Sequence, residues 1–177
     1  MTNLPTQTTR TEGWLSPLKL SVFRSMWSVW FVANICMWMN DVAAAWTMTS
    51  LTTSATLIAL VQTASSLPVL LLGIPSGALA DIINRKNYFV FAQIWLATNA
   101  TALMLFMAFD ALNPYLLLLL TFTNGIGLAM RWPIFAAIVP DLVPRDILPS
   151  ALALNAIAMN TSRIIGPLTA GAIIAAA

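Results

Sequence analysis

The chain has 177 residues, of which 59% are hydrophobic and only 8% are charged, and its formal net charge is +2. A soluble domain has about a quarter of its residues charged, so this composition excludes that class and favours a membrane protein. The chain has no histidine and one cysteine, Cys36, which excludes a Ser-His-Asp triad, a Cys-His dyad, the usual zinc sites and an intrachain disulfide.

The first segment, residues 1–22, is polar and threonine-rich. We expect a short flexible cytoplasmic tail there, without a cleaved signal peptide. Five apolar runs follow, each long enough for a helix that crosses a hydrocarbon core about 30 Å thick. They cover residues 25–48, 57–80, 88–109, 115–139 and 150–176. The predicted fold class is therefore all-α, a polytopic membrane protein with five transmembrane helices in one domain over residues 23–177.

Basic residues outside the predicted spans lie at one side of the membrane only. They occur before the first run, between the second and third, and between the fourth and fifth: Arg10, Lys19, Arg24, Arg85, Lys86 and Arg145. The breaks at residues 49–56 and 110–114 contain no Lys or Arg. The positive-inside rule then predicts a cytoplasmic amino terminus in a multi-pass protein of the inner or plasma membrane.

Three ionisable residues lie within the predicted spans: Asp41, Arg131 and Arg163. A charge near the bilayer centre costs at least about 2.5 kcal/mol, so such residues are expected to face a cavity or a partner. A rise of about 1.5 Å per residue places Asp41 and Arg163 at the same depth. Two interpretations stay open, a structural ion pair between these helices and a role in proton coupling or substrate binding.

Polar residues also share a face on two of the predicted helices. In the first helix this face carries Trp30, Asn34, Met37, Trp38, Asp41, Ala44 and Ala45, and in the fourth Asn124 and Arg131 are seven residues apart. Polar faces on two membrane-spanning helices predict that both helices line one shared cavity, which holds water or a ligand. Hydrogen bonding between helices is the alternative for either asparagine taken singly, and membrane-interface anchoring is the interpretation favoured for Trp27 and Trp30.

The segment GALADIINRKNYF, residues 77–89, connects the second and third predicted helices. Gly77 allows helices to approach closely, Asp81 is expected to end one helix, and Arg85 and Lys86 hold the turn at the cytoplasmic side. This segment resembles the signature loop of the major facilitator superfamily, which reads Gly-x-Leu-Ala-Asp-Arg-x-Gly-Arg-Lys.

The segment SRIIGPLTAG, residues 162–171, combines small residues with a proline. Pro167 lacks an N–H, so the helix can bend there, and small residues four apart provide a smooth packing face. The segment is similar to the fifth-helix motif of proton-driven antiporters in that superfamily, which implies a packing and hinge element associated with export. Its matching positions include Ser162, Gly166, Pro167, Ala170 and Gly171.

From about residue 17 to its end, the chain resembles the superfamily branch that includes enterobactin exporters and macrolide-efflux proteins. The resemblance covers the first five helices of a twelve-helix fold, so the chain is expected to be an incomplete amino-terminal half of a longer transporter. The chain does not match the superfamily's fourth-helix motif Arg-x-x-Gln-Gly. When Arg131 is aligned with the Arg of the motif, Ile134 and Phe135 occupy the Gln and Gly positions. That motif's proton-relay role is therefore not transferred to Arg131.

The predicted function is proton-coupled export, by antiport, of a small amphipathic molecule such as a siderophore or drug. The alternative is a non-transporting scaffold or truncated remnant that needs a partner chain, and an intramembrane enzyme is disfavoured. No cofactor or metal is expected beyond a proton gradient. Expected partners are the lipid bilayer, a small-molecule substrate, and the missing carboxyl-terminal half or a second chain, but no nucleic acid. Two Arg against one Asp in the spans favour an anionic substrate.

Overall fold

The computed structural model describes residues 13–176, apart from the side chains of Ala80, Asp81 and Arg85, which lie outside the described residues. Five long α-helices make up nearly all of this part of the chain. In order they are α1 (Ser21–Leu51), α2 (Ala55–Ile82), α3 (Arg85–Ala108), α4 (Pro114–Leu142) and α5 (Leu148–Ala176), preceded by the short 3-10 helix η1 (Ser16–Lys19). The all-α class expected from the sequence is confirmed.

Side-chain caps begin three of the helices. The Ser54 side chain accepts a hydrogen bond from the backbone N–H of Leu57 at the start of α2. Asn84 accepts from two backbone N–H groups at the start of α3, and Asn113 caps α4, whose first residue is Pro114. These residue types satisfy N–H groups that have no partner within the helix, and they allow connections of only a few residues.

The observed helices start two to four residues before most of the predicted spans, and the amino-terminal segment differs more. Residues 16–19, expected within a flexible tail, form η1, in which Ser16 and Pro17 are buried. This short helix packs against both α1 and α5. The part of the expected tail before residue 13 lies outside the described residues.

Three of the described helices are long and apolar enough to cross a membrane, over residues 55–79, 86–108 and 114–142. These are α2, α3 and α4. The other two helices, α1 and α5, contain Asn, Ser and Thr residues as well as Asp41 and Arg163. They pack side by side, so part of this polar surface is turned away from lipid.

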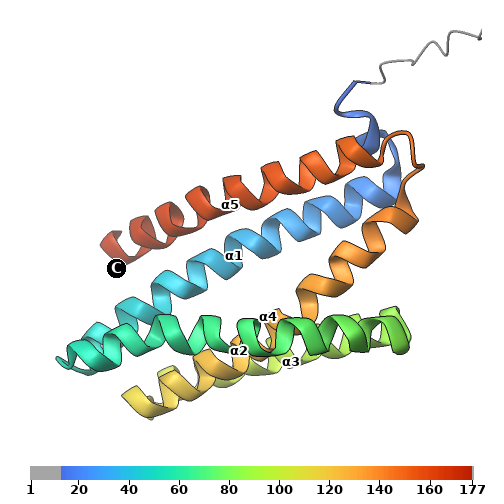
Figure 1. The fold of residues 1–177 in the computed structure, drawn as a ribbon. Helices are drawn as coiled ribbons and strands as arrows, with labels where there is room; N and C mark the ends of the chain where they lie inside the picture. The colour runs from blue at the N-terminus through green and yellow to red at the C-terminus, as the bar shows by residue number, and fades with distance from the viewer. Residues whose placement is uncertain (1–12, 177) are drawn as a thin grey trace, which may run out of the picture.

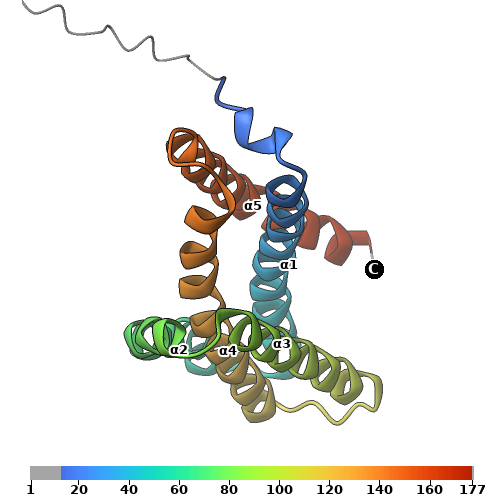
Figure 2. The ribbon, with the colours of Figure 1, turned by 90° about the vertical axis from the view of Figure 1, so that its right-hand side faces the viewer.

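The helices run roughly lengthwise along the molecule and form two main pairs, α1 with α5 and α2 with α4 (Figure 1). The third helix, α3, packs against α4. Viewed nearly end-on, α1 and α4 lie opposite each other, with α5 on one side of them and α2 and α3 on the other (Figure 2). The contact between α1 and α4 places the candidate site in the interior.

Two glycines allow α4 to approach its neighbours closely. A Cβ atom on Gly125 would lie 2.6 Å from the backbone oxygen of Ser65 in α2, and one on Gly127 would lie 2.6 Å from Cδ2 of Leu96 in α3. Small residues at such crossings are typical of helix association in membranes. The two glycines therefore set the position of α4 between α2 and α3.

The small residues of the fifth-helix motif lie in the interface between α5 and α1. Ser162, Gly166 and Ala170 are all buried, and the Ser162 hydroxyl donates to the backbone oxygen of Phe31 at 3.3 Å. A Cβ on Gly166 would lie 2.5 Å from Cβ of Trp38. The helix continues through Pro167, and Gly171 faces open space.

We predict that Gly166→Ala lowers the free energy of unfolding by about 1 to 3 kcal/mol, because the added methyl group overpacks the α1–α5 interface. The matched variant Gly171→Ala should leave stability unchanged or slightly raised, since a Cβ there meets no other atom within 4 Å. Thermal unfolding of both variants in detergent measures the difference. Equal melting temperatures would contradict this account of the interface.

Candidate functional site

Arg131 is the buried charge at the centre of the candidate site. It comes from α4, and only 5% of its surface is exposed. Its Nη2 donates to Oδ1 of Asn34 in α1 at 3.5 Å and lies 4.0 Å from the sulfur of Met37. The Nε atom is buried and has no hydrogen-bond partner. A guanidinium has five N–H donors, so this one is only weakly satisfied by the residues around it.

Asn34 connects the two helices at this point. It is fully buried in α1, and its side-chain nitrogen donates to the backbone oxygen of Trp30 at 2.8 Å. This bond leaves the Asn34 oxygen directed to Arg131. The predicted polar faces of the first and fourth helices therefore meet, and the bond between helices, which was the alternative for Asn34, is present. Asn124, the other residue of the α4 stripe, is half-buried.

Two aromatic rings complete the surroundings of Arg131. Trp30 and Phe135 stack with centroids 3.5 Å apart and planes 6° apart, and the guanidinium carbon lies 4.7 Å from the centroid of Trp30. The expectation that Trp30 anchors the chain at the membrane interface is corrected here, because Trp30 is buried in the core. Trp27 is half-buried, and its indole donates to the backbone oxygen of Leu154 in α5 at 3.2 Å, so its anchoring role stays a prediction.

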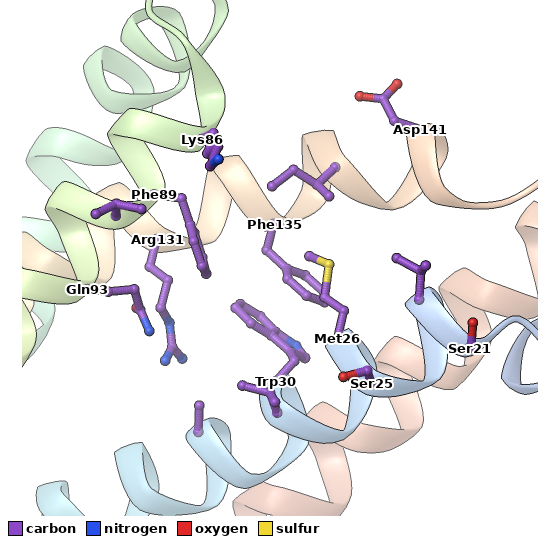
Figure 3. A pocket seen from close by; sticks show the side chains of 15 residues that line it. Ser21, Ser25, Met26, Trp30, Lys86, Phe89, Gln93, Arg131, Phe135 and Asp141 are labelled. Carbon is purple, nitrogen blue, oxygen red and sulfur yellow. The ribbon is translucent and has the colours of Figure 1, made fainter.

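A groove of about 860 Å³ lies beside this cluster, between α1, α3 and α4 (Figure 3). We call it the α1 groove. Arg131, Trp30 and Phe135 line its inner wall, Gln93 lies close to the guanidinium, and Lys86 lies toward one end. Phe135 and Gln93 were not predicted as site residues from the sequence. Phe135 stands four residues after Arg131, which is the helical spacing that could have indicated it.

Asp41 and Arg163, predicted at matching depth, form no salt bridge between their described side chains. Asp41 is half-buried in α1, on the face that also carries Asn34. Arg163 is exposed in α5, and its guanidinium carbon lies 5.5 Å from the ring centroid of Trp38. The ion pair that we had considered is therefore not present in this structure, and Arg163 makes a cation–π contact with Trp38.

The signature loop lies at the turn from α2 to α3. Gly77 is half-buried, and a Cβ there would meet Pro133 of α4 only at 3.9 Å, an ordinary contact. The side chains of Asp81 and Arg85 lie outside the described residues, whereas Lys86 is exposed. Close by, the hydroxyls of Ser76 and Tyr88 share a buried hydrogen bond of 2.7 Å that joins α2 to α3.

The chemistry available at this site is that of binding. Among the described residues, no group of three or more Cys, Asp or Glu side chains could hold a metal ion. The cluster offers a guanidinium, an amide and two stacked rings, which can bind a polar or aromatic group inside an otherwise apolar bundle. None of these groups is a nucleophile or a general base at neutral pH.

Comparison with known proteins adds to this geometry. A family model described as transmembrane secretion effector matches residues 12–177. The chain belongs to this family of the major facilitator superfamily. Its five helices, with a buried polar cluster between α1 and α4, correspond to the amino-terminal part of such a protein.

Two curated relatives are transport proteins. The chain is 26% identical to the staphyloferrin A transporter of Staphylococcus aureus over 140 residues, which are 78% of this chain and 35% of that protein. It is 24% identical to macrolide efflux protein A of Streptococcus pyogenes over 148 residues, 84% of this chain and 36% of that protein. The chain thus spans about a third of the length of these relatives. No solved structure matches it.

We predict that Trp30→Ala destabilises the protein by about 3 to 5 kcal/mol, because it removes a large buried ring from the contact between α1 and α4. Trp46→Ala is the matched control, since Trp46 lies in the same helix with 58% of its surface exposed. Thermal unfolding in detergent measures both effects. A loss of stability as large for Trp46→Ala would contradict the role assigned to the stacked pair.

Arg163→Ala should cost only about 0.5 to 1 kcal/mol, the usual value of an exposed cation–π contact. A buried ion pair with Asp41 would cost several times more when one partner is removed. The same unfolding measurement distinguishes the two cases, with Arg163→Lys as a variant that keeps the charge. A drop comparable to that of Trp30→Ala would restore the ion-pair interpretation.

Proposed function

We propose that this chain is the amino-terminal part of a proton-coupled exporter of small amphipathic molecules. The proposed location is the plasma or inner membrane, with the amino terminus in the cytoplasm. Transport in general is supported by the family and by the two relatives, which are named a transporter and an efflux protein. Export, the antiport mechanism and the substrate class are the finer parts of the proposal.

One observation carries the proposal: a polar stripe on α1 meets a buried guanidinium from α4 inside an apolar helical bundle. Asn34 and Asp41 are seven residues apart on one face of α1, and Arg131 reaches that face at Asn34. Buried polar groups are expensive in a membrane protein, and they commonly mark the path of a substrate or ion. A protein that only filled space in lipid would need none of them.

Asp41 is the residue we assign to proton coupling. It is the one acidic side chain of the described residues that lies deep within a predicted span, and it forms no salt bridge with Arg163. A carboxyl group that is half-buried and not neutralised by a fixed cation can take up and release a proton. This makes it better suited to coupling than either arginine, which stays charged.

The substrate proposal is a small molecule with an apolar body and a negative charge. In the described spans, Arg131 and Arg163 outnumber Asp41. The exposed Arg163 of α5 is free of a salt bridge with Asp41 and could meet an anionic group at the same depth. The activity requires the remainder of a longer protein, because two halves must move against each other to give alternating access.

We expect Asp41→Asn in the full-length protein to abolish efflux driven by a pH gradient while leaving expression and thermal stability intact. The amide keeps the size of the side chain but cannot exchange a proton. Uptake of a fluorescent amphipathic anion into inverted membrane vesicles, with and without an imposed pH gradient (acidic inside), measures the effect, because the cytoplasmic face of such vesicles is outside.

The matched control is Asp110→Asn. Asp110 lies in the exposed turn between α3 and α4 at a positive φ of 51°, a conformation that asparagine also tolerates. This variant should transport normally. Undiminished gradient-driven efflux by Asp41→Asn would refute its coupling role. The alternative function, a non-transporting scaffold, predicts no gradient-driven efflux even from the unaltered full-length protein.

A further inference from the structure

The segment before α1 exposes large apolar side chains at one end of the bundle. It covers residues 13–20, GWLSPLKL, and includes η1, and we call it the η1 segment. Trp14 has 62% of its surface exposed and Leu15 has 45%. Neither residue belongs to the candidate site. Two neighbouring apolar side chains that are turned outward in this way indicate a contact with a partner that is itself partly apolar.

The η1 segment is held firmly against the bundle. Its turns are closed by backbone hydrogen bonds of 2.7 to 3.1 Å between residues three apart. Pro17 is fully buried, and Leu18 packs against the core cluster that contains Phe23 of α1. Because these inner side chains fix the backbone, the exposed side chains are presented outward before any partner binds. Docking then costs little conformational entropy.

The η1 segment lies across the starts of α1 and α5 instead of continuing α1. Leu20, which separates η1 from α1, has an extended backbone with φ −76° and ψ 116°, so the chain changes direction there. Both views of the ribbon show the segment turned aside at the end of the bundle (Figures 1 and 2). A segment that turns aside where a membrane-spanning helix begins lies at the level of the lipid headgroups.

Positive charge accompanies the exposed apolar side chains. Lys19 of η1 and Arg24 in the first turn of α1 are both exposed. Residues 13–40 contain no Asp or Glu, so no acidic residue of this stretch neutralises the two cations. A surface that combines tryptophan, leucine and basic residues is typical of a contact with the headgroups of an anionic leaflet.

The Trp14 indole has the properties of an interface anchor. Among the described residues, its N–H makes no hydrogen bond. Tryptophan is enriched at membrane–water interfaces because its ring is apolar while its N–H still needs an acceptor. The indole of Trp27, in contrast, already donates to Leu154. Trp14 therefore fits the anchoring role better than Trp27 does.

A further protein element fits this surface less well than lipid. Burying Lys19 and Arg24 under such an element would cost free energy unless the element brought acidic side chains to both. Lipid headgroups bring phosphate groups, and both charged ends stay in contact with water at the interface. Lipid is therefore the occupant that the charge of this surface favours.

We propose that the η1 segment, together with Arg24, is a docking surface for anionic phospholipid headgroups of the cytoplasmic leaflet. Trp14 and Leu15 enter the interface, and Lys19 and Arg24 contact phosphate groups. The choice of leaflet rests on the proposed orientation of the chain. Since η1 packs against both α1 and α5, the bound lipid also holds the starts of these two helices together.

Fluorescence quenching in the full-length protein tests where the segment lies. The probe is Gly13→Cys in a background without native cysteines, labelled with the fluorophore NBD. A Cβ on Gly13 meets no atom within 4 Å, and Trp14 is retained. The protein is placed in nanodiscs of phosphatidylcholine and phosphatidylglycerol that carry a nitroxide on some headgroups. The matched control is Asp146→Cys, in the exposed connection between α4 and α5.

We expect the nitroxide lipid to quench the Gly13 probe about twofold more than the Asp146 probe, because the η1 segment is anchored in the interface. Iodide in the water should quench the Gly13 probe less. Strong quenching of both probes by iodide, with little by the nitroxide, would place the segment in water and overturn the proposal. Shielding of the Gly13 probe from both quenchers would also overturn it, because protein would then cover the surface.

Thermal unfolding of the same protein tests the headgroup charge. Replacing phosphatidylcholine by phosphatidylglycerol should raise the melting temperature, and Lys19→Gln should remove about half of this rise. The matched control is Lys86→Gln, because Lys86 is an exposed lysine outside the η1 segment. That variant should keep most of the rise. Equal losses in the two variants would indicate a diffuse attraction of all basic residues and would refute a docking surface on η1.

The orientation is measured separately from the docking. A membrane-impermeant maleimide should not label Gly13→Cys in intact cells, and it should label the probe once the cells are opened. Labelling in intact cells would refute the proposed cytoplasmic amino terminus, and with it the choice of leaflet. Neither quenching nor unfolding depends on transport, so both results stand apart from the outcome for Asp41.

Discussion

Close approach of helix backbones is the constraint on which the rest of this structure depends. Lipid is as apolar as the helix surfaces, so packing of small residues has to hold the bundle together. Gly125 and Gly127 bring α4 against α2 and α3, and Gly166 brings α5 against α1. Once these contacts are made, α1 and α4 face each other closely enough for the side chain of Arg131 to reach Asn34.

Burying the polar cluster between α1 and α4 costs free energy, and the contacts that surround Arg131 offset only part of this cost. Arg131 has a long hydrogen bond to Asn34 and a cation–π contact with Trp30, but no salt bridge among the described residues. The unfilled hydrogen-bonding capacity of Arg131 is understandable if the cluster belongs to a longer protein. The chain spans only about a third of the length of its two transport relatives, which agrees with this interpretation.

Different faces of α1 make different contacts. Asn34 and Asp41 lie on the face toward the bundle interior, where a substrate or proton would pass. Val29, Val32 and Cys36 are exposed on the nearly opposite side. Its neighbour α5 is on a third side, held by Ser162 and Gly166. One helix can thus both pack against its neighbours and line the proposed transport path, because 3.6 residues per turn distribute its side chains around the helix axis.

The sequence by itself determined the membrane class, the five helices and the family resemblance. Long apolar runs and basic turns are local properties, and the small residues of the fifth helix are recognisable from their spacing alone. Depth along each helix also followed from counting residues. That was enough to select Arg131 and Asn34 as buried polar residues, but it could not say which side chains meet.

Only the tertiary structure decided the partners, because a contact depends on how each helix is rotated and which helix lies next to it. Asp41 and Arg163 share a depth, yet they form no salt bridge, and Trp38 faces Arg163 instead. Trp30, which looked like an interface anchor, stacks on Phe135 in the core. The exposure of Val29 and Val32 in α1 became visible in the same way, since an exposed valine and a packed one look identical in a sequence.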